Sequence, residues 1–127
     1  SYHHHSFPTI SIEKVYDEIM QLDALLLDQF QYKMTLVRPP KGEFNEQSLA
    51  LSNLLGYQTV LWSYAYYDYN VADQPDPTSA LKKNLDNAHP GAIYLLHSVS
   101  DTNTQILSDL IEGLRNLNYE VSRYDLK

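Results

Sequence analysis

Segments with helical periodicity alternate along this chain with short apolar runs, and this alternation limits the fold more than any other feature. From Ser11 to about Gln29, apolar side chains recur at steps of three and four residues, which predicts a helix capped by Thr9 or Ser11. Further helices are predicted to begin at Asn45, at Thr78 and, through a capping box with Gln105, at Thr102. The apolar runs predict strands at 34–37, 59–62, 92–96 and 119–122.

Strands that alternate with helices of this length indicate an α/β fold with parallel strands. The 127 residues form one domain at most, 1–127. Because a closed (β/α) barrel takes about 250 residues, the chain is expected to be about half of one; a small open α/β sheet is the alternative. In both folds, ligands bind beyond the carboxyl ends of the strands.

Composition excludes several classes of protein. Nine Lys and Arg against 16 Asp and Glu give a formal net charge of −7, so neither nucleic acid nor an anionic membrane surface is an expected partner. No apolar run reaches the length of a membrane span. With no cysteine, any metal must be held by His, Asp or Glu.

Polar and aromatic side chains gather at the carboxyl ends of the predicted strands. Arg38 ends the first strand, the segment 62–68 leaves the second, and His97 ends the third. The cluster His3-His4-His5 precedes the first helix; it is either native or the remainder of an affinity tag. A guanidinium, a carboxylate, an imidazole and a metal ligand in one cleft would suit a metal-assisted hydrolase.

Four motifs in order resemble the polysaccharide deacetylase family, the NodB-homology carbohydrate esterases, and among them the peptidoglycan N-deacetylases of the delta-lactam type. They are Ser1-Tyr2-His3-His4, Arg38-Pro39-Pro40-Lys41-Gly42, Trp62 with Asp68-Tyr69, and Leu95-Leu96-His97-Ser98. The resemblance implies the C-terminal part of a distorted (β/α) barrel, and it implies removal of acetate from N-acetylated amino sugars outside the cell or at its wall. It leaves open whether the sugar is muramic acid or glucosamine.

The resemblance also implies a role for individual residues. His4 would be a ligand of a divalent cation, usually zinc, and His97 would be the general acid, oriented by Asp68. Arg38 would steady the catalytic base, and the backbone amide of Lys41 would face the oxyanion. Trp62 and Leu95 would shape the pocket for the acetyl methyl group, and Tyr69 would pack on the sugar.

Departures from the family pattern lead to further expectations. The family's Thr-Phe-Asp-Asp-Gly motif supplies the base and an aspartate ligand, and no Asp-Asp pair occurs in these 127 residues. We therefore expect these residues alone to bind zinc weakly and to be inactive, and expect a half-barrel with open strand edges to self-associate. The alternatives are a non-catalytic carbohydrate-binding or interaction module, and an unrelated cytoplasmic α/β domain.

Overall fold

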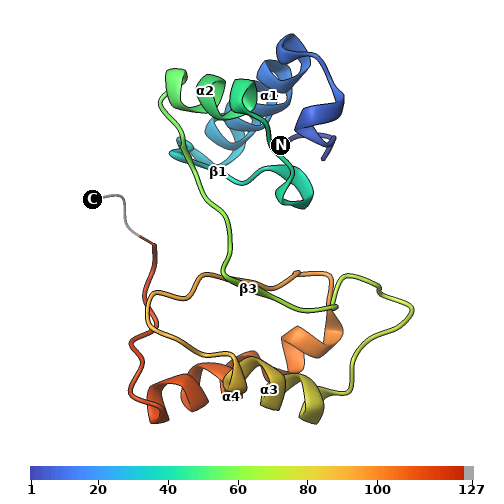
Figure 1. The fold of residues 1–127 in the computed structure, drawn as a ribbon, viewed down its shortest axis with the longest axis vertical. Helices are drawn as coiled ribbons and strands as arrows, with labels where there is room; N and C mark the ends of the chain where they lie inside the picture. Colours follow the sequence, from blue (N-terminus) through green and yellow to red (C-terminus); the bar gives the residue numbers. More distant parts are fainter. Residues whose placement is uncertain (125–127) are drawn as a thin grey trace. The chain divides into compact units, whose positions relative to one another are not determined.

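The computed structural model describes residues 1–124, which form two compact units (Figure 1). Unit 1 comprises residues 1–61 and unit 2 begins at residue 62. Each unit contains two α-helices and one pair of short parallel strands, and unit 1 also contains two short 3-10 helices, Phe7–Thr9 and Pro40–Gly42. The elements of unit 1 are α1 (Ile12–Phe30), β1 (Leu36–Val37), α2 (Glu46–Leu54) and β2 (Gln58–Thr59), and those of unit 2 are β3 (Tyr64–Ala65), α3 (Pro77–Asp86), β4 (Tyr94–Leu95) and α4 (Asp101–Asn116).

The predicted alternation of helices and parallel strands is confirmed in both units. In unit 1, Leu36 of β1 pairs with Gln58 of β2, and in unit 2, Ala65 of β3 pairs with Leu95 of β4. Each pair is joined through a helix, because parallel strands need a long crossover connection. The expectation of one domain over residues 1–127 stays a prediction.

Local sequence signals account for the helices of unit 1. The Ser11 side chain accepts a hydrogen bond from the backbone of Lys14, so of the two predicted caps of α1 it is Ser11 that serves. Asn45 and Ser48 form a reciprocal capping box at the start of α2. Apolar side chains of α1 then pack with residues from both ends of the unit in one core: Phe7, Val15, Ile19, Met34, Val37 and Tyr57.

Unit 2 is built around the packing of α3 on α4 (Figure 1). The apolar face of α4 buries Ile106 and Leu110, and Ile106 packs with Ala80 of α3 and Tyr66. Tyr66 directly follows β3, and Leu96, which directly follows β4, packs against the same core, so the core holds the two chain segments that lead to the predicted site residues.

Three sequence predictions need correction. Of the strand expected at 59–62, only Thr59 lies in a strand, at the end of β2, and β3 begins at Tyr64 in the other unit. The cap of α4 is Ser100 and not Thr102, because the Thr102 hydroxyl donates to the carbonyl oxygen of Pro75, at 2.7 Å. The strand expected at 119–122 does not form, since no strand pairs with it among the described residues.

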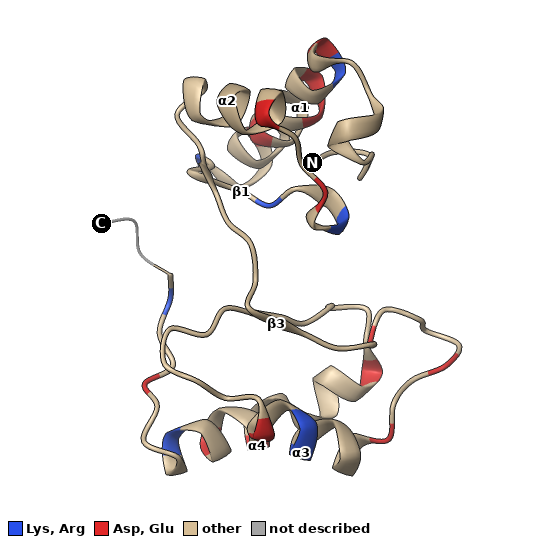
Figure 2. Ribbon diagram, viewed as in Figure 1, with Lys and Arg blue, Asp and Glu red and all other residues tan. Residues whose placement is uncertain are grey.

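Charged side chains are scattered along both units rather than gathered into a basic stripe (Figure 2). Lys and Arg occur singly or in one adjacent pair, Lys82 and Lys83 of α3, among acidic and uncharged residues. Across residues 1–124, none of the helices combines the length and the apolar character that crossing a membrane would require.

Candidate functional site

The strand register of unit 2 brings Asp68 and His97 together. Ala65 and Leu95 are paired in the parallel strands, and Asp68 and His97 follow them by three and two residues. Since both strands end at the same edge of the pair, the two side chains meet there. The Asp68 Oδ1 to His97 Nδ1 distance is 2.7 Å, so this part of the predicted site forms as expected.

The Asp68 carboxylate is completely buried and is satisfied by hydrogen bonds. Its Oδ2 accepts from the backbone N–H of His97, at 2.7 Å, and from the Asn103 amide nitrogen, at 2.6 Å, and its Oδ1 lies against His97 Nδ1. A buried carboxylate is tolerated only with such partners. Because Asp68 can only accept, the proton between the two side chains lies on Nδ1, and the neutral imidazole keeps Nε2 unprotonated.

The loop that carries Asp68 is fastened by Gln74. The Gln74 amide nitrogen donates to the carbonyl oxygens of Asp68, at 3.2 Å, and Asn70, at 2.6 Å. Its oxygen accepts from the hydroxyl of Ser100, the cap of α4, at 2.6 Å. The loop after β3 is thus bound to the start of α4, and the carboxylate is held in a fixed place.

Aromatic side chains surround the exposed side of this pair. The ring of Tyr69 contacts the imidazole of His97 edge to face, with centroids 5.8 Å apart, and Tyr67 contacts Tyr69 in the same manner at 4.8 Å. The His97 side chain is 32% exposed and Tyr69 is 57% exposed, so a ligand in solution can reach both. Trp62 and Leu95 are half-buried in the same unit, before β3 and within β4.

In unit 1, the buried carboxylate of Glu18 holds the turn that contains the histidine cluster. One oxygen accepts from the backbone N–H of His3, at 2.9 Å, and the other lies 3.0 and 2.9 Å from Nδ1 of His3 and His5. Burial alone would raise the pKa of Glu18, but the hydrogen bonds from His3 and His5 outweigh it and hold that pKa below its ordinary value. Glu18 is therefore an ionised acceptor in the core of unit 1.

His4 and Lys41 both have left-handed backbone conformations, with φ of 62° and 58°. Two other non-glycine residues of the described chain do so, Gln31 and Asn118, and both follow a helix end, where this conformation is common. His4 and Lys41 have no such explanation. Left-handed residues that are not glycine cost about 1 to 2 kcal/mol and cluster at functional sites.

The surroundings of His4 favour its neutral form. Partial desolvation and the positive charges of Arg38 and Lys41 lower the pKa of His4 below its ordinary value of 6.5. Arg38 directly follows β1, and Lys41 follows within the turn Pro40–Gly42, so these predicted residues share unit 1 with His4. The expectation that they meet Asp68 and His97 in one cleft stays a prediction.

The residues available for a metal do not complete the centre that the family resemblance implies. His4 is one imidazole, whereas a catalytic zinc ion takes three protein ligands. Within residues 1–124, the ligand atoms of His3, His5 and Glu18 do lie within 4.8 Å of one another, but direct hydrogen bonds already account for those contacts.

Sequence reasoning missed Glu18 and Asn103, the two buried residues that support the site. The signal was present in both cases. Glu18 lies three residues after Val15 on the apolar face of α1, and Asn103 lies three before Ile106 on the apolar face of α4. A polar side chain on an otherwise apolar helix face must find a buried partner, so such a residue is a candidate support for a site.

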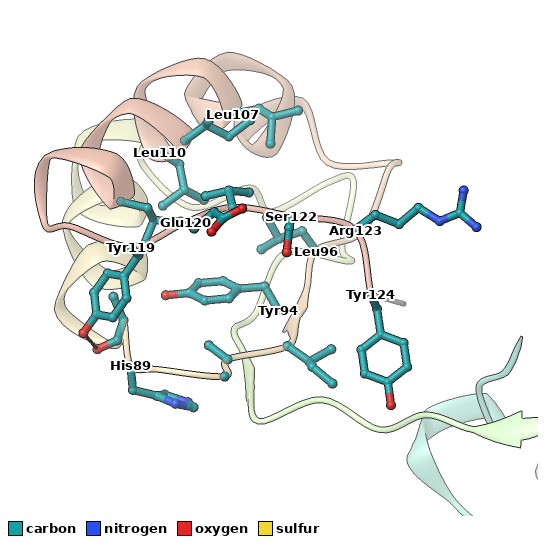
Figure 3. A pocket seen from close by; sticks show the side chains of 17 residues that line it. His89, Tyr94, Leu96, Leu107, Leu110, Tyr119, Glu120, Ser122, Arg123 and Tyr124 are labelled. Atoms are coloured by element: carbon teal, nitrogen blue, oxygen red, sulfur yellow. Dashed lines mark hydrogen bonds between the residues drawn. The ribbon is translucent and has the colours of Figure 1, made fainter. Parts of the chain in front are cut away.

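A separate pocket of unit 2, of about 860 Å³, lies between α4 and the segment 119–124 (Figure 3). Tyr94 lines this pocket, as do Leu107, Leu110 and Leu114 of α4. None of the predicted site residues lines it. It is an apolar gap beside the segment that does not form a strand, and it takes no part in the Asp68 and His97 site.

The chain is similar in sequence to polysaccharide deacetylases. Residues 1–60 match the family described as polysaccharide deacetylase. The chain is 37% identical to the peptidoglycan-N-acetylmuramic acid deacetylase PdaA of Bacillus subtilis, over 98% of this chain and 48% of that protein. It is 29% identical to the peptidoglycan-N-acetylglucosamine deacetylase PgdA of Listeria monocytogenes, over 98% of this chain and 26% of that protein. The chain thus spans about half the length of PdaA and about a quarter of the length of PgdA.

Solved structures give the same result. Bacillus subtilis PdaA, a family 4 carbohydrate esterase, matches with a TM-score of 0.87 and 36% identity over 94% of this chain and 52% of that one. A mutant of BA3943, a CE4 family pseudoenzyme with restored enzymatic activity, matches with a TM-score of 0.85 and 25% identity over 95% of this chain and 43% of that one. The expected α/β fold with parallel strands, part of a distorted barrel, is confirmed.

Proposed function

The chain belongs to the polysaccharide deacetylase family, and on that premise we propose that it carries the proton-donating side of an N-deacetylase that acts on peptidoglycan or a related amino-sugar polysaccharide. The observation that carries the proposal is the pair formed by Asp68 and His97, a fully buried carboxylate that orients a partly exposed imidazole. The sugar is muramic acid or glucosamine, as in the two relatives named above.

Hydrolysis of an acetamide needs a proton at the departing nitrogen. Water adds to the acetyl carbon, the carbon–nitrogen bond breaks, acetate leaves, and the sugar nitrogen takes up a proton to leave as an amine. In this proposal, protonated His97 gives that proton from Nε2, the nitrogen that Asp68 does not engage. Asp68 would orient the ring through its contact with Nδ1, which leaves Nε2 as the nitrogen that faces the departing amine.

The other predicted residues receive roles in the same reaction. Arg38 would steady the catalytic base, and the backbone amide of Lys41 would donate to the developing oxyanion. The left-handed conformation of Lys41 supports this role, because strained loops of this kind present backbone groups at functional sites. Trp62 and Leu95 would bound the acetyl-methyl pocket, and Tyr69, exposed beside His97, would pack on the sugar ring.

His4 is the one metal ligand that these residues supply in this proposal. Deacetylases of this family are generally metal-dependent. His4 would be one ligand, and its lowered pKa supports this role because a neutral imidazole binds metal. We propose that the 127 residues alone bind zinc weakly and release no acetate, since the other ligands and the base that the resemblance implies are not among them.

The substrate indicates where the protein acts and what it binds. Relatives are named as peptidoglycan deacetylases, so we place the action of this protein at the cell wall or outside the cell. Its partner would be an N-acetylated glycan. Self-association of the isolated chain remains a prediction; several large apolar side chains are exposed, among them Leu54 at 84% and Phe30 at 68%.

The test is acetate release from N-acetylated peptidoglycan by the complete protein and its His97→Ala variant. The loss of a general acid is expected to lower turnover by about 10² to 10⁴-fold. His89→Ala is the matched control, since His89 lies exposed just before the same strand and should leave turnover unchanged. Turnover of His97→Ala within twofold of the wild type would remove His97 from the acid role, and glycan binding without any acetate release would favour the binding module.

A further inference from the structure

We propose that Asn103 is a positioning residue for His97, acting through the Asp68 carboxylate. This inference rests on the proposed function, in which His97 handles the proton. Asn103 lies in the first turn of α4, where its backbone N–H donates to the Ser100 hydroxyl, at 3.1 Å. Neither the motifs of the sequence nor the family resemblance pointed to it.

The amide nitrogen of Asn103 binds both members of the pair. It donates to Asp68 Oδ2, at 2.6 Å, and to the backbone carbonyl oxygen of His97, at 3.1 Å. Asn103 is 7% exposed and Asp68 is not exposed at all, so water does not compete for these bonds. The Asn103 side chain thus links the Asp68 carboxylate to the backbone of His97, the residue that Asp68 orients.

The orientation of the Asn103 amide is itself determined. The buried hydroxyl of Tyr66 donates to Asn103 Oδ1, which leaves the nitrogen to face Asp68. The reverse orientation would set the amide oxygen against a carboxylate oxygen and a carbonyl oxygen, three acceptors with no proton between them. Tyr66, Asn103, Asp68 and His97 therefore form one chain of hydrogen bonds with a single satisfactory arrangement.

A neutral amide suits this place better than a charged group. The Asp68 carboxylate accepts three N–H groups, two from His97 and one from Asn103, so both of its oxygens are fixed. An amide does not titrate, so its contact persists whether the imidazole is neutral or protonated. A cation in its place would compete with the imidazolium for the same carboxylate and weaken its effect on His97.

The experiment measures the tautomer of His97 in the ¹⁵N-labelled chain by NMR, at a pH where the imidazole is neutral. The wild type is expected to give a single Nδ1–H tautomer. Asn103→Leu keeps the side-chain size but removes the amide, and it should lose this pattern and give a mixture of tautomers. Tyr66→Phe removes only the hydroxyl that orients the amide and should shift the pattern in the same direction, which covers the case that Asn103→Leu does not fold.

Thr102→Val is the matched control. Thr102 is the neighbour of Asn103 in α4, it is 2% exposed, and its hydroxyl makes one buried hydrogen bond, to the Pro75 carbonyl oxygen. The variant should lose stability but keep the wild-type tautomer. The proposal is wrong if Asn103→Leu and Tyr66→Phe both keep the Nδ1–H tautomer, or if Thr102→Val disturbs it equally. Because no turnover is measured, a failure of deacetylation would leave this result standing.

Discussion

Replacing Asp68 with asparagine tests the chemistry of the site most directly, since Asp68→Asn keeps the shape and removes only the charge. The asparagine oxygen can occupy the place of Oδ2 and still accept from the His97 backbone and from Asn103. Its NH₂ group then faces His97 Nδ1, which must give up its proton and become an acceptor. The imidazole is expected to switch to the Nε2–H tautomer.

The expected loss of stability follows from the three hydrogen bonds that Asp68 accepts, two from His97 and one from Asn103. Bonds to a charged group contribute about 1.5 to 3 kcal/mol and bonds between neutral groups about 0.5 to 1.5, so each of the three weakens by about 1 kcal/mol. Because the neutral amide costs less to bury than the carboxylate, this gain offsets part of the stability lost at the hydrogen bonds. A net loss of about 2 kcal/mol in the free energy of unfolding of unit 2 is expected.

Urea denaturation followed by Trp62 fluorescence measures this loss, because Trp62 is the sole tryptophan and belongs to unit 2. Asp86→Asn is the matched control. Asp86 forms an exposed ion pair with Lys82, at 2.5 Å, and its removal should cost less than about 0.5 kcal/mol. If the two variants lose equally little stability and the tautomer does not switch, the Asp68 carboxylate does not hold His97 as argued.

Three further predictions concern buried polar groups. Glu18→Gln should lower the free energy of unfolding of unit 1 by about 1 to 3 kcal/mol at pH 7, whereas Asp17→Asn, at an exposed position, should not. Since folding lowers the pKa of Glu18, the stability that its ionised carboxylate contributes should be lost in urea titrations as the pH falls below about 4.5. Burial, with the hydrogen bond to Asp23, raises the pKa of Tyr57 from 10 to about 12. About 3 kcal/mol of stability should therefore be lost as the pH rises from 10 to 12. Tyr57→Phe should remove this dependence of stability on pH, measured by circular dichroism. Ser100→Ala should cost about 1 to 2 kcal/mol in thermal unfolding as α4 loses its cap, and an unchanged melting temperature would contradict it.

Part of the site could be predicted because the residues that form it lie at the ends of paired strands. The pairing of Asp68 with His97 follows from two parallel strands and the positions where they end, and both were expected to meet. Of the histidine cluster, the sequence predicted His4 as the metal ligand, and that stays a prediction; His3 and His5 bind the Glu18 carboxylate. A sequence pattern cannot show which of three adjacent imidazoles turns toward a buried acid, because the acid lies on a helix that only folding brings beside them.

The sequence by itself determined the features that depend on near neighbours. Helical periodicity and the cap Asn45 are set within a few residues, and the starts of α1, α2 and α3 were predicted to within about one residue. Tertiary structure decided the features in which a group chooses between partners. Ser100 rather than Thr102 caps α4 because Pro75 takes the Thr102 hydroxyl, and residues 119–122 fail to form a strand because a strand needs a hydrogen-bonded neighbour that only the packed chain can supply.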